Sequence, residues 1–301
     1  LTFTASYYQR SAGEVALAAL PPQLRELSPE QMARRLKRAK PVEGASGAVL
    51  AVPALTPEQA SAVAQIAVHP GPFLLFGATG SGKTEVYLHC VHKLLAADPD
   101  AQALIMVPEI NLTPQLEERF KARFAPLYGE QAVVSLHSGM TNPQRLKSWL
   151  AAHGGAARIV LGTRMAVFAS LPKLRLIVVD EEHDPSYKSS EGARYSARDL
   201  AVYRGKLEGA QVILGSATPS LESWHHSRPA EEGGRYLRLH MPSRVGESSK
   251  LPLVRRVDMN HQPRKAVFSL PLVDAIKERV ARGEQCMVFL NRRGYAPVLT
   301  C

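Results

Sequence analysis

A glycine-rich segment between an apolar run and a helix-forming stretch is the feature that most constrains this fold. Residues 72–76 before it are largely apolar, and residues 85–89 after it favour a helix. Its glycines can adopt positive φ and let backbone N–H groups close around phosphate oxygens. The segment consists of Gly77, Ala78, Thr79, Gly80, Ser81, Gly82, Lys83 and Thr84.

The last two residues of this segment carry the chemistry of phosphate binding. Lys83 supplies a positive charge for the β- and γ-phosphates, and the Thr84 hydroxyl can hold Mg²⁺. The segment therefore predicts a nucleotide-binding loop. The alternative is a glycine-rich turn that binds no ligand.

Composition bounds the class of protein. The 301 residues are 45% hydrophobic and 21% charged, enough for a substantial core in one or two domains. No apolar run approaches the ~20 residues of a membrane span, and the first residues lack the features of a signal peptide. The cysteines Cys90, Cys286 and Cys301 make no disulfide framework. We therefore expect a cytoplasmic protein without a membrane partner.

The charge balance points to a polyanionic partner. The formal net charge is +10, and clustered Lys and Arg side chains bind phosphate backbones. The densest basic run, in residues 34–40, is predicted to be helical and to end before Pro41. It is either a solvated helix or a contact with the DNA backbone.

Strand-like and helix-like segments alternate along most of the chain. Predicted strands cover residues 103–107, 132–136, 158–161, 176–180 and 211–214, and predicted helices cover residues 56–68, 114–124, 143–152 and 197–207. Such alternation predicts βαβ units, hence an α/β fold with a mostly parallel sheet covered by helices on both faces. The strands are nearly continuous apolar runs, as is typical of strands buried on both sides.

The two ends of the chain differ from this central part. Residues 1–50 carry too little periodic apolar sequence for an independent domain, and we expect an N-terminal remnant followed by a linker. Residues 51–240 should form the nucleotide-binding lobe. Residues 228–265 are a weaker region, after which a helix at 272–280 and a buried strand at 285–290 should open a second α/β unit within residues 241–301.

Acidic residues end one of the predicted strands. Asp180 and Glu181 follow the apolar residues 176–179, at the edge where open α/β sheets place their ligands. Asp180 can reach the Mg²⁺ beside Thr84, and Glu181 is the candidate to polarise an attacking water. The alternative is an ordinary acidic surface turn.

A hydroxyl-rich segment follows another predicted strand. Residues 215–220 read Gly-Ser-Ala-Thr-Pro-Ser and should lie at the same sheet edge as the acidic residues. Their hydroxyls could hydrogen-bond to the acidic cluster, or Thr218 or Ser220 could cap a helix, and both can hold together.

Together these motifs resemble the first motor lobe of superfamily 2 helicases, and further strings are similar to the PriA family of bacterial primosomal helicases. Those strings are residues 107–115, 137–139, 162–164, 180–188 and 291–297. The resemblance covers essentially the whole chain. It implies a RecA-like P-loop NTPase lobe, the start of a second RecA-like lobe, and ATP and Mg²⁺ as cofactors.

The resemblance also implies an activity and its partners. It implies an ATP-driven 3′-to-5′ DNA helicase that recognises forked DNA and initiates primosome assembly in replication restart. The partners would be single-stranded and forked DNA, primosome proteins and single-strand-binding proteins, with the helicase as a monomer. Two alternatives remain: a double-strand DNA translocase that does not unwind, and a nucleotide-gated platform for primosome proteins.

Individual residues acquire roles by the same resemblance. Gln59 matches an adenine-reading glutamine, although its place three residues after Thr56 also suits a helix cap. Arg164 matches a segment along the single-strand track. Residues 182–198 resemble an aromatic-rich loop that binds DNA, with candidates Tyr187, Lys188, Arg194 and Tyr195. The alternative is a surface loop whose tyrosines pack on the domain.

The final residue and the missing motifs complete these expectations. Cys301 matches the first cysteine of a zinc-binding insertion, so Zn is expected only in the full-length protein. The arginine fingers of the family belong to second-lobe motifs that would follow Cys301. We therefore expect this chain to bind ATP and to hydrolyse it poorly.

Overall fold

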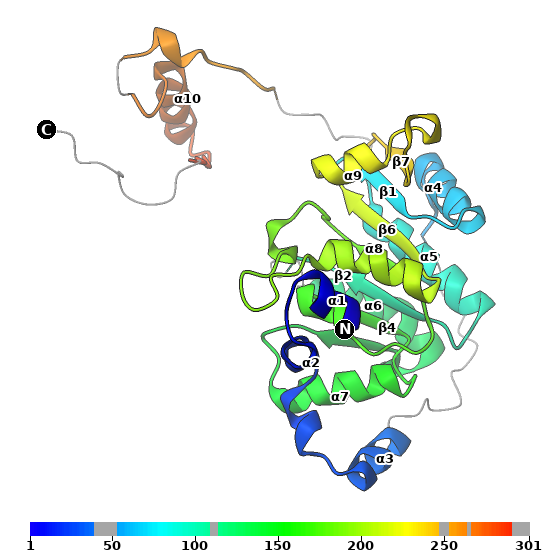
Figure 1. Cartoon of the computed structure of the whole chain (residues 1–301). Coiled ribbons are helices and arrows are strands. Elements are labelled where there is room, and N and C mark those ends of the chain that lie inside the picture. Colours follow the sequence, from blue (N-terminus) through cyan, green and yellow to red (C-terminus); the bar gives the residue numbers. More distant parts are fainter. Residues whose placement is uncertain (39–52, 109–113, 247–252, 264–265, 291–301) are drawn as a thin grey trace, which may run out of the picture. The chain divides into compact units, whose positions relative to one another are not determined.

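The computed structural model describes residues 1–38, 53–108, 114–246, 253–263 and 266–290. They belong to two compact units, Leu1–Glu247 and Ser248–Cys301. The first unit contains the sheet and the predicted nucleotide-binding loop (Figure 1).

A seven-stranded parallel sheet forms the centre of the first unit (Figure 1). Its spatial order is β3-β4-β2-β5-β6-β1-β7, and every neighbouring pair is parallel, so none of these pairs is a hairpin. The strands are β1 (Phe73–Gly77), β2 (Gln102–Met106), β3 (Val133–Leu136), β4 (Ile159–Gly162), β5 (Leu174–Val179), β6 (Gln211–Ser216) and β7 (Leu237–Met241).

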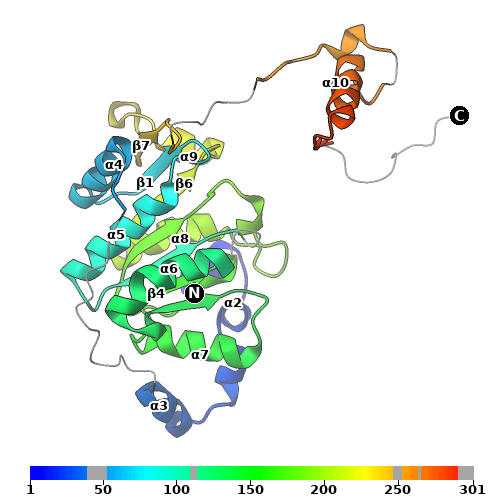
Figure 2. The same ribbon diagram turned by 180° about the vertical axis from the view of Figure 1, so that it is seen from behind.

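Helices cover both faces of this sheet (Figure 2). One buried apolar cluster joins the sheet to α4 (Pro57–Val68), α5 (Lys83–Ala97) and α6 (Pro114–Tyr128). A second cluster, on the other face, joins it to α7 (Asn142–His153) and α8 (Ala197–Glu208). The α/β fold with a parallel sheet, predicted from the alternation of segments, is confirmed.

Local capping explains where two of these helices begin. The Thr56 side chain accepts a hydrogen bond from the Gln59 backbone, and the Gln59 side chain accepts one from the Thr56 backbone, so α4 begins with a reciprocal capping box. The same box forms between Thr141 and Gln144 at the start of α7. These contacts satisfy backbone N–H groups that have no partner inside the helix.

The N-terminal helices pack on the sheet-containing lobe and have no core of their own. They are α1 (Thr2–Tyr7), α2 (Ala12–Ala19), the 3₁₀ turn η1 (Pro22–Glu26) and α3 (Pro29–Arg38). Leu24 and Leu36 from this region pack against the buried cluster of Leu146, Trp149 and Leu150 on α7. No helix in the described ranges has both the length and the apolar character needed to cross a bilayer.

Two parts of the fold differ from expectation. Strand β7 lies in the region that the sequence marked as weak, and it was not predicted. It is an edge strand in which Arg238 and His240 alternate with apolar residues, so it lacks the continuous apolar run of a buried strand. The strand expected at 285–290 does not form: Met287 is 97% and Phe289 85% exposed. A strand needs a neighbour for its backbone groups, and the described part of the second unit offers only α10 (Leu270–Ala281) and a short 3₁₀ turn.

Candidate nucleotide-binding site and the adjoining loop

The glycine-rich segment forms a loop between β1 and α5 at the carboxyl edge of the sheet. Gly82 has φ 80°, and a Cβ added there would lie 2.3 Å from Nε2 of Gln59. A Cβ on Gly77 would lie 2.6 Å from the Ser81 hydroxyl, which is buried and has no hydrogen-bond partner among the described residues. The loop thus has the close backbone approach and the free polar group of a phosphate cradle.

Lys83 occupies the centre of this cradle. Its buried Nζ donates a hydrogen bond to the Gly77 carbonyl at 3.1 Å and lies 3.8 Å from Oε1 of Glu181. Glu181 is the second residue after β5. The loop after β1 and the segment after β5, which are far apart in the sequence, therefore meet at one edge of the sheet. The expected juxtaposition of the loop lysine and the strand-end carboxylates is present.

A cavity of about 550 Å³ lies over the loop. Thr84 and Asp180 both line it and provide a hydroxyl and a carboxylate, the oxygen donors that Mg²⁺ prefers. Among the described residues, no group of three or more His, Cys, Asp or Glu side chains could hold a metal by itself. The residues therefore fit a Mg²⁺ that also takes phosphate oxygens as ligands. The cavity's predicted site residues are Gln59, Thr79, Gly80, Gly82, Lys83, Thr84, Asp180 and Glu181.

Gln59 serves the loop as well as its own helix. Its side-chain amide donates to the Ser81 carbonyl at 3.0 Å, while its carbonyl oxygen caps α4 at Thr56. Gln59 is buried and lines the cavity, so the helix cap and the phosphate loop are held by one side chain. Contact with adenine stays a prediction.

Two tyrosines position Asp180, a role that the sequence assigned to neither of them. Tyr87, fully buried on α5, donates its hydroxyl hydrogen to Oδ1 of Asp180 at 2.8 Å. A Cβ on Gly215 of β6 would lie 1.8 Å from the Tyr87 hydroxyl, so only glycine leaves room for it. A second tyrosine, Tyr187, donates to the Asp180 backbone carbonyl at 2.7 Å. The side chain and backbone of Asp180 are therefore both fixed before any ligand binds.

Glu181 has an unusual backbone conformation. Its φ is 46°, in the left-handed region that side chains other than glycine, Asn and Asp seldom adopt. Its Oε2 lies 3.6 Å from Nδ1 of His183. Residues held in such conformations cluster at functional sites, and this outlier coincides with the carboxylate predicted to act on water.

The aromatic residues of the adjoining loop are buried. Tyr187 is 2% exposed, and Tyr195 is 8% exposed and packs edge-on against Phe168. Base stacking needs an exposed ring face, so neither ring is available for it in this conformation. The arrangement matches the alternative in which the tyrosines pack on the domain.

Basic side chains, by contrast, remain at the loop surface. Lys188 and Arg194 are exposed, and Arg194 has φ 46°. Arg164 donates to the backbone carbonyls of Ser186 and Lys188 at 2.9 and 3.2 Å, so it braces the loop. The structure thus brings Arg164 and Lys188 together near the end of β5.

Comparison of the sequence with known families identifies the family of this chain. The family model described as DEAD/DEAH box helicase matches residues 56–226, which is more than half of the chain. The chain belongs to the DEAD/DEAH box helicase family.

Curated relatives narrow the resemblance. The replication restart protein PriA of Haemophilus influenzae is 42% identical over 249 residues, which cover 82% of this chain and 32% of that protein. PriA of Bacillus subtilis is 41% identical over 232 residues, covering 76% and 27%. PriA of Rickettsia conorii is 35% identical over 305 residues, covering 100% and 43%. The resemblance to the PriA family is confirmed, and the chain spans about a third of the length of the first two relatives.

The hydroxyl-rich segment of this helicase lobe binds the acidic cluster. Glu182 is buried and accepts hydrogen bonds from the Ser220 and Ser223 hydroxyls at 2.9 and 2.8 Å. The Ser220 hydroxyl also caps α9 (Leu221–His226). Next to it, Nδ1 of His183 lies 2.8 Å from the Ser216 hydroxyl. Both expectations for this segment, contact with the acidic cluster and helix capping, are confirmed.

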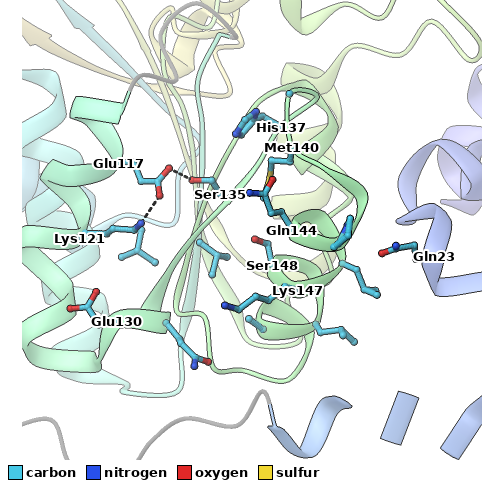
Figure 3. A pocket seen from close by; sticks show the side chains of 18 of the residues that line it. Gln23, Glu117, Lys121, Glu130, Ser135, His137, Met140, Gln144, Lys147 and Ser148 are labelled. Carbon is cyan, nitrogen blue, oxygen red and sulfur yellow. Dashed lines mark hydrogen bonds and ion pairs between the residues drawn. The ribbon is translucent and has the colours of Figure 1, made fainter. Parts of the chain in front are cut away.

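A larger cavity of the helicase lobe, about 940 Å³, lies along the open edge of β3 (Figure 3). Glu117 of α6 lines this cavity. It accepts a hydrogen bond from the Ser135 hydroxyl at 2.7 Å and forms an ion pair with Lys121 at 2.6 Å (Figure 3). Among the residues that line it, none is predicted to bind nucleotide, although Arg35 belongs to the basic run that could contact the DNA backbone. The smaller cavity over the glycine-rich loop is therefore the candidate nucleotide site.

The partly buried position of Asp180 in the helicase lobe predicts a change in stability. Desolvation raises its pKa; the Tyr87 hydrogen bond lowers it, and Glu181 raises it further. A raised pKa in the folded state stabilises the fold at low pH, and this stabilisation is lost as the pH rises through that pKa. At pH 7, Asp180→Asn should therefore raise the free energy of unfolding of the nucleotide-free chain by about 1 kcal/mol.

Urea denaturation of the wild type and the Asn variant checks this prediction. The advantage of the variant should shrink as the pH is lowered toward about 4, near the pKa of an unfolded Asp. A variant less stable than the wild type at pH 7 would show that the carboxylate is well compensated in the apo state.

Proposed function

We propose that this chain is the ATP-binding motor lobe of a 3′-to-5′ DNA helicase that recognises forked DNA and initiates primosome assembly in replication restart. The observation that carries the proposal is the meeting of Lys83 with the carboxylates at residues 180–181 over a cavity of about 550 Å³. The relatives named replication restart protein PriA support a role in replication restart.

Each residue of the site has a defined task in ATP hydrolysis. The loop backbone and Lys83 bind the phosphates, and Lys83 exchanges the Gly77 carbonyl for a phosphate oxygen. Thr84 and Asp180 would hold Mg²⁺, which when bound neutralises charge on the phosphates. Glu181, 3.8 Å from the ammonium of Lys83, orients the attacking water and accepts its proton.

Loss of the Glu181 carboxylate separates binding from hydrolysis. Glu181→Gln keeps a hydrogen-bonding side chain but cannot accept a proton, so turnover should fall by roughly 10²- to 10⁴-fold. ATP affinity should change little. Steady-state hydrolysis and ATP titration of the longer protein check this, with the exposed Glu191→Gln as a control on the same loop. Unimpaired hydrolysis would remove Glu181 from its assigned role.

Poor hydrolysis by this chain alone is a separate part of the proposal. The family's arginine fingers belong to a second lobe, and such arginines contribute roughly 10³- to 10⁵-fold in rate. ATP turnover should therefore be much slower for this chain than for the longer protein on forked DNA. Equal turnover would contradict the dependence on a second lobe.

DNA contacts are assigned to the exposed basic side chains of the loop. Lys188 and Arg194 would bind phosphates, and Arg164 would hold the loop in place for them. Tyr187 and Tyr195 could reach bases only after the loop opened, because both rings are buried. A labelled fork with opposite single-stranded tails tests both unwinding and polarity. Translocation without strand displacement would favour a double-strand translocase.

Three finer points remain part of the proposal. Zn is expected at Cys301 in the longer protein, a position outside the described residues, and metal analysis of that protein tests it. We propose a monomeric state, and primosome and single-strand-binding proteins as partners, from the resemblance, and a cytoplasmic location from the composition. If Glu181→Gln in the longer protein left fork restart intact, a nucleotide-gated platform would fit better.

A further inference from the structure

An arginine cluster lies at the amino edge of the sheet, opposite the nucleotide cavity. Its members are Arg228, Arg235 and Arg238, in the connection from α9 to β7 and at the start of β7. Leu237 pairs with Phe73 at the beginning of β1, which fixes this segment at the amino edge. A strand of five residues spans about 16 Å, so the cluster cannot share a ligand phosphate with the loop after β1.

Among the described residues, no carboxylate forms an ion pair with this cluster. Nη1 of Arg228 lies 2.9 Å from Nε2 of His225, and Nη2 of Arg235 lies 3.3 Å from Nδ1 of His226. Arg238 donates to the Ser227 hydroxyl and the Trp224 carbonyl at 3.0 and 3.1 Å. No ion pair is found for these three arginines within the described residues, whereas others do pair with acids, among them Arg119, Arg123, Arg158, Arg198 and Arg204.

The cluster lines a groove of about 490 Å³, and no Asp or Glu is among the described residues that line it. Glu231 and Glu232 lie in the adjacent 3₁₀ turn η6 (Ala230–Glu232) but do not line it. Nε of Arg228 is buried and has no hydrogen-bond partner among the described residues. The groove therefore combines uncompensated positive charge with an unused donor, which suits an anionic ligand.

The scaffold holds at least one of these arginines in a fixed position. The Arg238 guanidinium stacks on the Trp224 ring at 3.5 Å, and Phe76 of β1 packs edge-on against the same ring. Because Arg238 covers a face of Trp224, that face is closed to bases. Backbone contact is thus favoured over base stacking, as expected for duplex DNA and not for an unpaired strand.

We propose that this groove binds the phosphate backbone of a duplex DNA arm. The inference rests on the DNA-directed function proposed above and adds a second DNA contact to it. The predicted single-strand residues lie near the carboxyl end of β5, at the other edge of the sheet. A fork has duplex arms besides its single strand, so the two edges of one lobe can hold different parts of the same fork.

The salt dependence of duplex binding tests the proposal. A fluorescein-labelled 20-base-pair duplex is titrated with this chain and with the R228A/R235A double variant from 50 to 200 mM salt. Arg238 is left intact because it also binds the carbonyl at the end of α9. The variant should bind the duplex roughly tenfold more weakly at 50 mM, and the slope of log affinity against log salt should fall by about 1.8, for two phosphates.

Two control variants distinguish local contact from net charge. K173A/R175A removes the same charge from exposed side chains around the start of β5 and should change the slope much less. R228K/R235K keeps the charge and should retain most of the slope. If R228A/R235A loses folding, shown by thermal melting, the comparison of R228K/R235K with a R228Q/R235Q variant replaces it.

The possible outcomes separate this proposal from the function it builds on. A slope equal to that of K173A/R175A, or no duplex binding by the unmodified chain, would overturn the duplex site. If R228A/R235A bound polyglutamate more weakly but bound DNA as well as the unmodified chain, the groove would be assigned to an acidic protein, which would also overturn the duplex site. The proposed function is tested separately: it would be contradicted if the unmodified chain did not bind ATP.

Discussion

Replacing Lys83 by alanine is expected to weaken ATP binding by roughly 10- to 100-fold, the effect of losing a charge-assisted contact. In the free protein its ammonium hydrogen-bonds to the Gly77 carbonyl and lies close to Glu181, which keeps it at the centre of the cradle. No other ammonium lines the nucleotide cavity in the described part of the chain. Titration with a fluorescent ATP analogue in the presence of Mg²⁺ measures the loss.

A lysine on the same helix provides the matched control. Lys93 lies on α5 as well but is exposed, and Lys93→Ala should leave ATP affinity within about twofold of the wild type. Equal affinities for Lys83→Ala and the wild type would mean that the nucleotide does not bind in this loop.

Replacing Glu85 by alanine should destabilise the lobe by about 3 kcal/mol, because it breaks a buried charge network. Arg123 donates to Oε1 of Glu85 at 2.7 Å and Arg119 to Oε2 at 2.9 Å, which ties the phosphate-loop helix to α6. Arg123 is buried, and its Nη1 already has no partner among the described residues. Without Glu85 the Arg123 charge would remain buried and unpaired.

Denaturant unfolding measures this loss, and its pH dependence has a definite sign. Burial raises the pKa of Glu85, but the hydrogen bonds from Arg123 and Arg119 outweigh it and hold the pKa below the usual value. The stabilisation is therefore present above the pKa of an unfolded Glu and is lost as the pH falls through the folded value.

Glu118→Ala, an exposed change on α6, should cost less than about 0.5 kcal/mol. If Glu85→Ala were no more destabilising than Glu118→Ala at pH 7, the network would not support the lobe.

The sequence was sufficient for the strands of the sheet other than β7, and for the residues that follow them. Buried parallel strands are apolar runs separated by amphipathic helices, so their places could be predicted without knowledge of their pairing. The phosphate loop and the acidic residues 180–181 were predictable because both follow such runs, and parallel strands bring their carboxyl ends to one edge.

What the sequence left out depends on contacts between distant segments. Tyr87 looked like an ordinary apolar position of α5, and only the sheet order brings its hydroxyl to Asp180. Gly215 lay in a segment noted for its hydroxyls, with no sign that it makes room for that tyrosine. Tyr187 and Tyr195 had the composition of a stacking surface, but exposure is not readable from composition, and they are buried.

The most direct test of the account is a crystal structure of this chain with a non-hydrolysable ATP analogue and Mn²⁺ in place of Mg²⁺. The anomalous signal of Mn²⁺ should lie between the Thr84 hydroxyl and the Asp180 carboxylate, with the phosphates against the loop and Lys83. A metal or triphosphate bound elsewhere on the lobe would contradict the central claim that the carboxyl edge of the sheet is the motor site.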